Sequence, residues 1–154
     1  MSNAIPASSL SDIYRLLADG HKGYVEAGTR VETVDLARFL VELSMERQEM
    51  QQAVGKLIQQ MRPGEELPRG TIKGDLHRVW IDLREALTSA DDAVMLRECQ
   101  RGEEYLLERF DTVLDGKDPA DEAVAILRAQ RSKVAATLST IKQLRSTTGR
   151  APGA

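Results

Sequence analysis

The sequence predicts an all-α protein, an antiparallel four-helix bundle with an additional shorter helix in the crossover between two helical hairpins. Apolar residues recur three and four positions apart along four long segments, which places them on one face of a helix. No segment alternates apolar and polar residues over a useful length, so no strand is expected. Short connections join the first two long segments and the last two, while a long connection joins the pairs, which predicts two hairpins packed together.

The first hairpin is expected to contain helices over residues 9–31 and 34–61. Ser9 is followed three residues later by Asp12, the capping-box spacing in which a hydroxyl and an acid each accept a hydrogen bond from a free backbone amide. Thr33 precedes the second helix, and Asp35 lies in its first turn, where the helix dipole favours a negative charge.

A shorter helix over residues 71–88 is expected after the proline- and glycine-containing linker 62–70, and the second hairpin follows it. Its helices are predicted over 90–115, from the capping box that begins at Ser89, and over 119–146, with Asp118 as the cap. Residues 1–8 and 147–154 are small and polar, so we expect flexible tails on a single bundle domain, 9–146.

Composition narrows the class of protein. The chain has 154 residues, 29% of them charged, and a net charge of -3 with both signs interspersed, which argues against nucleic acid as a partner. No apolar run approaches the roughly 20 residues needed to span a bilayer, and no secretory signal is evident, so we expect a cytoplasmic protein without membrane association.

Cys99 is the only cysteine and is expected to be a small apolar core residue, with a reactive thiol as the alternative.

The apolar stripe of each long helix is interrupted near its midpoint. The interrupting residues are Glu46 and Arg47, Gly102 and Glu103, Gln130, and the stretch from Gly20 to Gly23. Midpoints of antiparallel helices lie at the same height, so Glu46, Arg47, Glu103 and Gln130 are predicted to form one buried polar layer.

Such a layer has two common uses. In carboxylate-bridged bundles it holds two metal ions, with Glu-x-x-His pairs on two of the helices. The candidate ligands for iron or manganese here are Glu26, Glu46, Glu49 and Glu103. Neither histidine of the chain follows a glutamate by three residues. In the other use no cofactor is bound, and Arg47 or Arg101 neutralises Glu46 or Glu103, which fixes the helix register more than it adds stability.

Two further features allow more than one interpretation. His77 and Trp80 lie three residues apart and share a face of the crossover helix, where they are expected to anchor it to the bundle, with a binding pocket as the alternative. The glycines at positions 20, 23 and 28 indicate either a close approach of another backbone or a loop or kink.

Several stretches resemble a known family. They are LLADGHKGYVEA (16–27), ELSMERQEM (42–50), GDLHRVWIDLREAL (74–87) and ECQRGEEYLLERF (98–110). They are similar to a bacterial family of ferritin-like bundles known only as a domain of unknown function, over about Leu10 to Leu144. The resemblance implies the bundle, with the His-Arg-x-Trp helix in its crossover, and it implies no activity. The Glu-x-x-His motifs of metal-binding ferritin relatives are missing, so ferroxidase chemistry is not expected.

The expected function is therefore that of a non-enzymatic interaction or stress-related protein with a buried polar layer. Self-association as a homodimer is expected, and no particular protein partner is indicated. The alternative is a carboxylate-rich bundle that binds iron or manganese and acts in oxidative stress or as a ferroxidase.

Overall fold

The computed structural model describes residues 4–31, 33–69 and 92–148, and this part of the chain folds into four long helices without a strand. They are α1 (Ala7–Arg30), α2 (Val34–Met61), α4 (Asp92–Leu114) and α5 (Glu122–Thr148). The all-helical prediction is confirmed. The predicted crossover helix over 71–88, with His77 and Trp80, lies outside the described residues.

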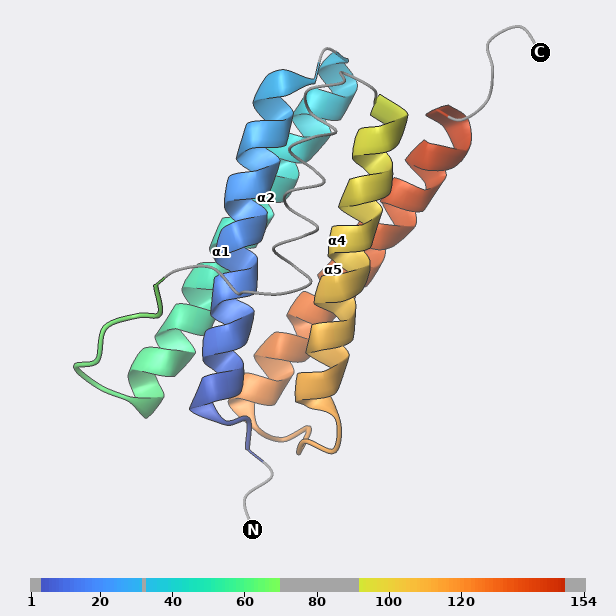
Figure 1. The fold of residues 1–154 in the computed structure, drawn as a ribbon. Coiled ribbons are helices and arrows are strands. Elements are labelled where there is room, and N and C mark those ends of the chain that lie inside the picture. The colour runs from blue at the N-terminus through green and yellow to red at the C-terminus, as the bar shows by residue number, and fades with distance from the viewer. Residues whose placement is uncertain (1–3, 32, 70–91, 149–154) are drawn as a thin grey trace, which may run out of the picture.

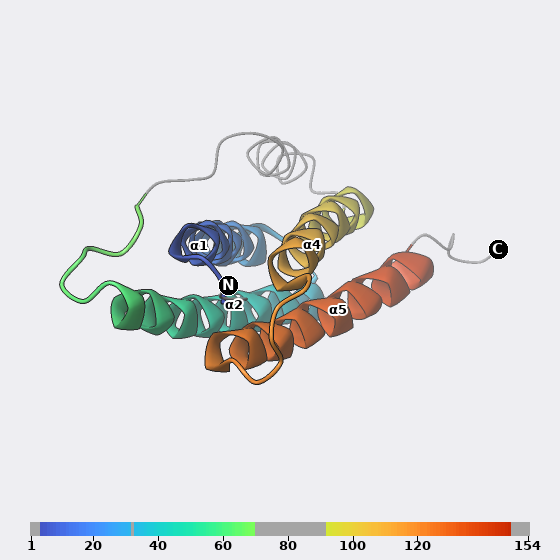
Figure 2. The ribbon, with the colours of Figure 1, turned by 90° about the horizontal axis from the view of Figure 1, so that it is seen from below.

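The helices form two antiparallel hairpins, α1 with α2 and α4 with α5, whose backbones approach most closely within each hairpin (Figure 1). Between the hairpins, α1 lies beside α4 and α2 lies beside α5, as the view along the bundle shows (Figure 2). The chain leaves α2 at one end of the bundle and enters α4 at the opposite end (Figure 1). Consequently α2 and α4 run in the same direction, while neighbouring helices run antiparallel.

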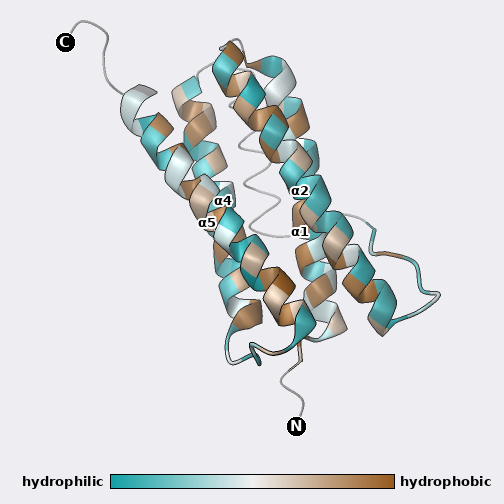
Figure 3. Cartoon of the chain, turned by 180° about the vertical axis from the view of Figure 1, so that it is seen from behind, coloured by the Kyte–Doolittle hydropathy of each residue, from teal (hydrophilic) through white to brown (hydrophobic). Residues whose placement is uncertain are grey.

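Each helix carries hydrophilic and hydrophobic residues in alternating patches along its length, as expected for amphipathic helices around a core (Figure 3). The buried apolar residues fall into two clusters. One contains Leu17, Met50 and Phe110, and the other contains Leu40, Met95 and Cys99. Along α2 and α4 the clusters meet at Arg47 and Glu103, so charged residues separate two apolar halves of the core. None of the helices in the described part is long and apolar enough to cross a membrane.

Two predicted helix starts are wrong. Helix α1 begins at Ala7, because the carbonyl of Pro6 already accepts hydrogen bonds from the amides of Ser9 and Leu10, and Ile5 is buried in the core. Ser9 therefore lies within the helix instead of capping it.

At α5, Asp118 shapes a preceding turn through its contact with the amide of Ala120, at 2.9 Å. The cap is Asp121, whose Oδ1 accepts hydrogen bonds from the amides of Ala123 and Val124, at 2.8 and 3.2 Å. The helix consequently starts three residues later than the Asp118 cap predicted.

The glycines of α1 lie within a continuous helix, so a loop at this point is wrong. At Gly28 the backbone of α2 comes close, since an added Cβ would lie 2.9 Å from Val41 Cγ2 and 3.4 Å from the carbonyl oxygen of Ala37. Gly20 instead faces the side chain of Arg47, whose Cγ would lie 3.7 Å from an added Cβ. The small residues therefore allow α1 to approach both the backbone and a large buried side chain of α2.

Candidate functional site

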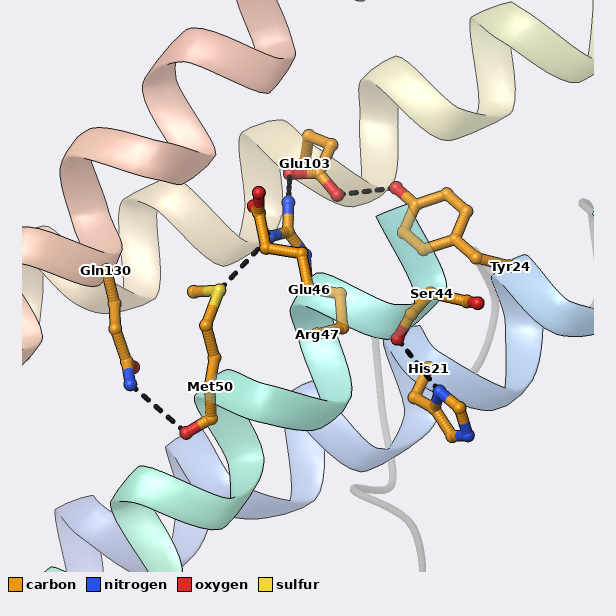
Figure 4. Close-up of polar contacts among 8 residues, drawn as sticks. All are labelled: His21, Tyr24, Ser44, Glu46, Arg47, Met50, Glu103 and Gln130. Atoms are coloured by element: carbon orange, nitrogen blue, oxygen red, sulfur yellow. Dashed lines mark hydrogen bonds and ion pairs between the residues drawn. The ribbon is translucent and has the colours of Figure 1, made fainter. Parts of the chain in front are cut away.

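Arg47, Glu103 and Tyr24 meet at the centre of the bundle, each contributed by a different helix (Figure 4). Arg47 comes from α2, Glu103 from α4 and Tyr24 from α1, and their exposed fractions are 0%, 2% and 2%. Arg47 interrupts the apolar stripe between Leu43 and Met50, so the same helical periodicity that buries these neighbours also buries the guanidinium. The site therefore links both hairpins through fully enclosed polar side chains.

Both carboxylate oxygens of Glu103 accept a hydrogen bond. Arg47 Nη2 donates to Oε2 at 2.5 Å, and the Tyr24 hydroxyl donates to Oε1 at 2.5 Å. Hydrogen bonds to an ionised carboxylate are stronger than those between neutral groups, and they are stronger again in a low-dielectric interior. Glu103 is therefore held from two sides, by a cation and by a neutral hydroxyl.

The second guanidinium nitrogen of Arg47 connects this centre to the edge of the bundle. Arg47 Nη1 lies 2.8 Å from Glu46 Oε1 and 3.2 Å from the sulfur of Met50. About a third of the Glu46 side chain is exposed, so this carboxylate lies between the core and solvent. The buried cation of Arg47 consequently contacts two carboxylates, the buried one of Glu103 and the partly exposed one of Glu46.

Gln130 lies beside this group rather than within it. Its Nε2 donates to the backbone carbonyl of Met50 at 3.1 Å, and Met50 in turn contacts Arg47 through its sulfur (Figure 4). Of the residues predicted to form the polar layer, Glu46, Arg47 and Glu103 are thus in direct contact. Gln130 extends the layer to α5 through Met50.

The surroundings determine the charge that each group carries. Burial alone would lower the pKa of Arg47. The charge of Glu103 and the hydrogen bond to it, together with Tyr24 and Glu46, outweigh burial, so the pKa of the guanidinium is raised above its usual value. Burial, followed by the charge of Glu103, raises the pKa of Tyr24 well above 10.0. At neutral pH the site therefore contains a charged Arg47 and an uncharged Tyr24.

Cys99 lies one helical turn from Glu103 and is also buried. Burial raises the pKa of its thiol, and the charges of Glu103 and Glu98 act in the same direction. The thiolate is the reactive form of cysteine, so this environment favours the inert thiol.

The four candidate metal ligands are not brought together. Glu46 and Glu103 both contact Arg47, whereas Glu26 pairs with Arg30 at 3.4 Å and Glu49 is exposed. Glu26 and Glu49 each lie two residues beyond a buried member of the site, a spacing that turns a side chain to another face of the helix. Within the described residues no group of three or more His, Cys, Asp or Glu side chains is arranged to hold a metal ion.

Sequence reasoning missed two contributions, those of Tyr24 and His21. Tyr24 fits the apolar spacing of α1, so an interrupted stripe does not point to it, although a buried tyrosine hydroxyl usually has a hydrogen-bond partner, which could have revealed it. Arg101, considered as a partner for the layer, instead lies 2.7 Å from Glu98. His21 joins the two helices of the first hairpin, with Nδ1 lying 2.9 Å from the carbonyl oxygen of Ser44.

Comparison with known proteins places the chain in a family. The model of a family described as a domain of unknown function, DUF2383, matches residues 6–116, and the chain belongs to this family. The match includes α1, α2 and α4, with Tyr24, Arg47 and Glu103, and ends before α5. No curated protein and no solved structure matches the chain significantly.

Proposed function

We propose that this member of the DUF2383 family is a non-enzymatic, self-associating interaction module built on a ferritin-like bundle. The ferritin-like assignment is supported by the order of the helices, because two hairpins joined by a connection between opposite ends of the bundle are typical of that form. We further propose that the protein acts in the cytoplasm.

The observation that carries the proposal is the position of Arg47. Carboxylate-bridged bundles place metal ions among inward-facing glutamates at the centre of the four helices. Here the guanidinium lies 2.5 Å from Glu103 and 2.8 Å from Glu46, and it supplies the positive charge that these carboxylates require. Because the guanidinium neutralises these carboxylates, a structural role for the buried polar layer is favoured over metal binding.

Self-association is supported by the outer surface of α2. Val34, Val41 and Met45 are exposed, and their spacing of seven and four residues places them on one face of the helix. Large apolar side chains grouped on one surface are typical of protein interfaces. We therefore propose a homodimer that buries this face of α2 against a second copy.

The metal content of the purified protein tests the core of the proposal. We expect iron and manganese well below one equivalent per chain. Stoichiometric iron or manganese that is lost in Glu103→Ala but retained in Glu49→Ala would overturn the proposal in favour of a metal-binding bundle. Glu49 is a suitable control because it is exposed on the same helix as Arg47.

The oligomeric state tests self-association separately. Light scattering coupled to gel filtration should give the mass of a dimer for the natural protein and for Lys142→Glu, an exposed position on α5 away from the proposed interface. Met45→Glu should give the mass of a monomer, because it buries a charge in the proposed interface. A monomeric natural protein, or a Met45→Glu variant that remains dimeric, would contradict the proposed interface.

A further inference from the structure

A small cavity lies against the buried site, between α1, α2 and α4. Its volume is about 10 Å³, and its polar lining is formed by Tyr24, Arg47 and Glu103. Gly20 and Gly102 also line it, and the absence of side chains at these positions leaves the space open. Two leucines complete the lining, so the cavity is polar on one side and apolar on the other.

Arg47, which lines this cavity, carries a buried donor without a partner among the described residues. Its Nη1 and Nη2 atoms donate to Glu46, Met50 and Glu103, but within the described part of the chain its Nε has no hydrogen-bond partner. The side chain is fully buried, so bulk solvent cannot reach this N–H group. Buried donors without a partner are rare in folded proteins, and ordered water usually satisfies those that protein atoms do not reach.

The chemistry of the lining restricts what can bind. The ligand must accept a hydrogen bond from Arg47 Nε, which excludes a metal cation beside the guanidinium. The carboxylate of Glu103 disfavours an anion in the same space. A cavity of this volume holds about one water molecule, and water both accepts from a guanidinium and donates to a carboxylate.

We propose that this cavity is a binding site for a single ordered water molecule, which accepts a hydrogen bond from Arg47 Nε and donates to Glu103. The water completes the hydrogen bonding of the buried guanidinium. The site also gives Gly20 a role, because a methyl group at this position would occupy the space beside Arg47. The proposal holds whether or not the protein self-associates.

A high-resolution crystal structure of the full chain tests the proposal directly. We expect electron density for one water within hydrogen-bonding distance of Arg47 Nε. The proposal would be overturned if a protein atom accepted the hydrogen bond from Arg47 Nε, or if the cavity held no density while the surrounding core was well ordered.

Oxygen-17 magnetic relaxation dispersion, which counts long-lived internal waters, tests it in solution. Gly20→Ala should fold, because its Cβ would meet Arg47 Cγ at 3.7 Å, an ordinary contact distance. The dispersion amplitude of this variant should fall by the contribution of one water molecule, whereas Lys22→Ala, at an exposed position on the same helix, should retain the full amplitude. Equal amplitudes for the natural protein and Gly20→Ala would contradict the proposal.

Discussion

Separating Arg47 from Glu103 by mutation is expected to destabilise the bundle far more than separating a surface pair at a similar distance. Arg47→Met leaves the buried carboxylate of Glu103 without its cation. Glu103→Gln leaves the guanidinium of Arg47 facing a neutral amide in place of a carboxylate. Removing one partner of a buried ion pair costs about 3–5 kcal/mol, because the remaining charge is uncompensated. The double variant leaves neither charge, so it should cost less than the sum of the two single changes.

The chain provides a matched control in Arg131 and Asp111. Arg131 Nε lies 2.6 Å from Asp111 Oδ1, close to the 2.5 Å of the buried pair, but 40% and 51% of these side chains are exposed. Exposed pairs contribute about 0.2–1 kcal/mol. Comparing Arg47→Met and Glu103→Gln with Arg131→Met and Asp111→Asn therefore isolates the effect of burial.

Urea unfolding followed by circular dichroism gives the free energies for both double-mutant cycles. We expect a coupling energy of about 2–3 kcal/mol for the buried pair and well below about 1 kcal/mol for the surface pair. A buried cycle that is additive within about 0.5 kcal/mol would refute the reasoning, because residues in contact should not behave independently.

Three other changes have defined outcomes. The folded pKa of Tyr24 lies above 10.0, so its contribution to stability is fully present below pH 10.0 and is lost as the pH rises through the folded pKa. Urea midpoints across this range should fall less steeply for Tyr24→Phe, and equal slopes would contradict the shift. Gly28→Ala should lower the unfolding free energy in urea by about 1–3 kcal/mol, because its Cβ would lie 2.9 Å from Val41 Cγ2. If adding Val41→Ala to this variant did not restore stability, this contact would be excluded as the cause. Asp121→Ala should lower the unfolding free energy by about 1 kcal/mol through loss of the α5 cap, and an equal loss in Asp118→Ala would show that the turn matters as much.

Helical periodicity predicted most of the fold because apolar spacing is a local property. The second helix was predicted over 34–61, and the structure has it over Val34–Met61. Helix starts were less predictable, because Asp118 and Asp121 are both good caps and the choice depends on the turn that contains Pro119. Ser9 also has a good capping pattern, yet the burial of Ile5 accompanies an earlier start to the helix.

The candidate site was predictable where charge interrupts an apolar stripe. This signal identified Arg47 and Glu103, whose contact is long-range and follows from the level midpoints of antiparallel helices. It could not identify Tyr24, because a tyrosine suits an apolar stripe and its hydroxyl partner depends on the rotation of α1 against α4. The pairing of Arg101 with Glu98 likewise depends on side-chain direction, which spacing alone does not determine.

The central claim is that Arg47, and not a metal ion, neutralises the carboxylates at the centre of this bundle. Anomalous diffraction from crystals grown with manganese tests that claim most directly. We predict that Arg47 Nη2 lies within hydrogen-bonding distance of Glu103 and that no anomalous peak appears beside Glu46 or Glu103. An anomalous peak bound by these two carboxylates, with the Arg47 side chain displaced from them, would contradict the account.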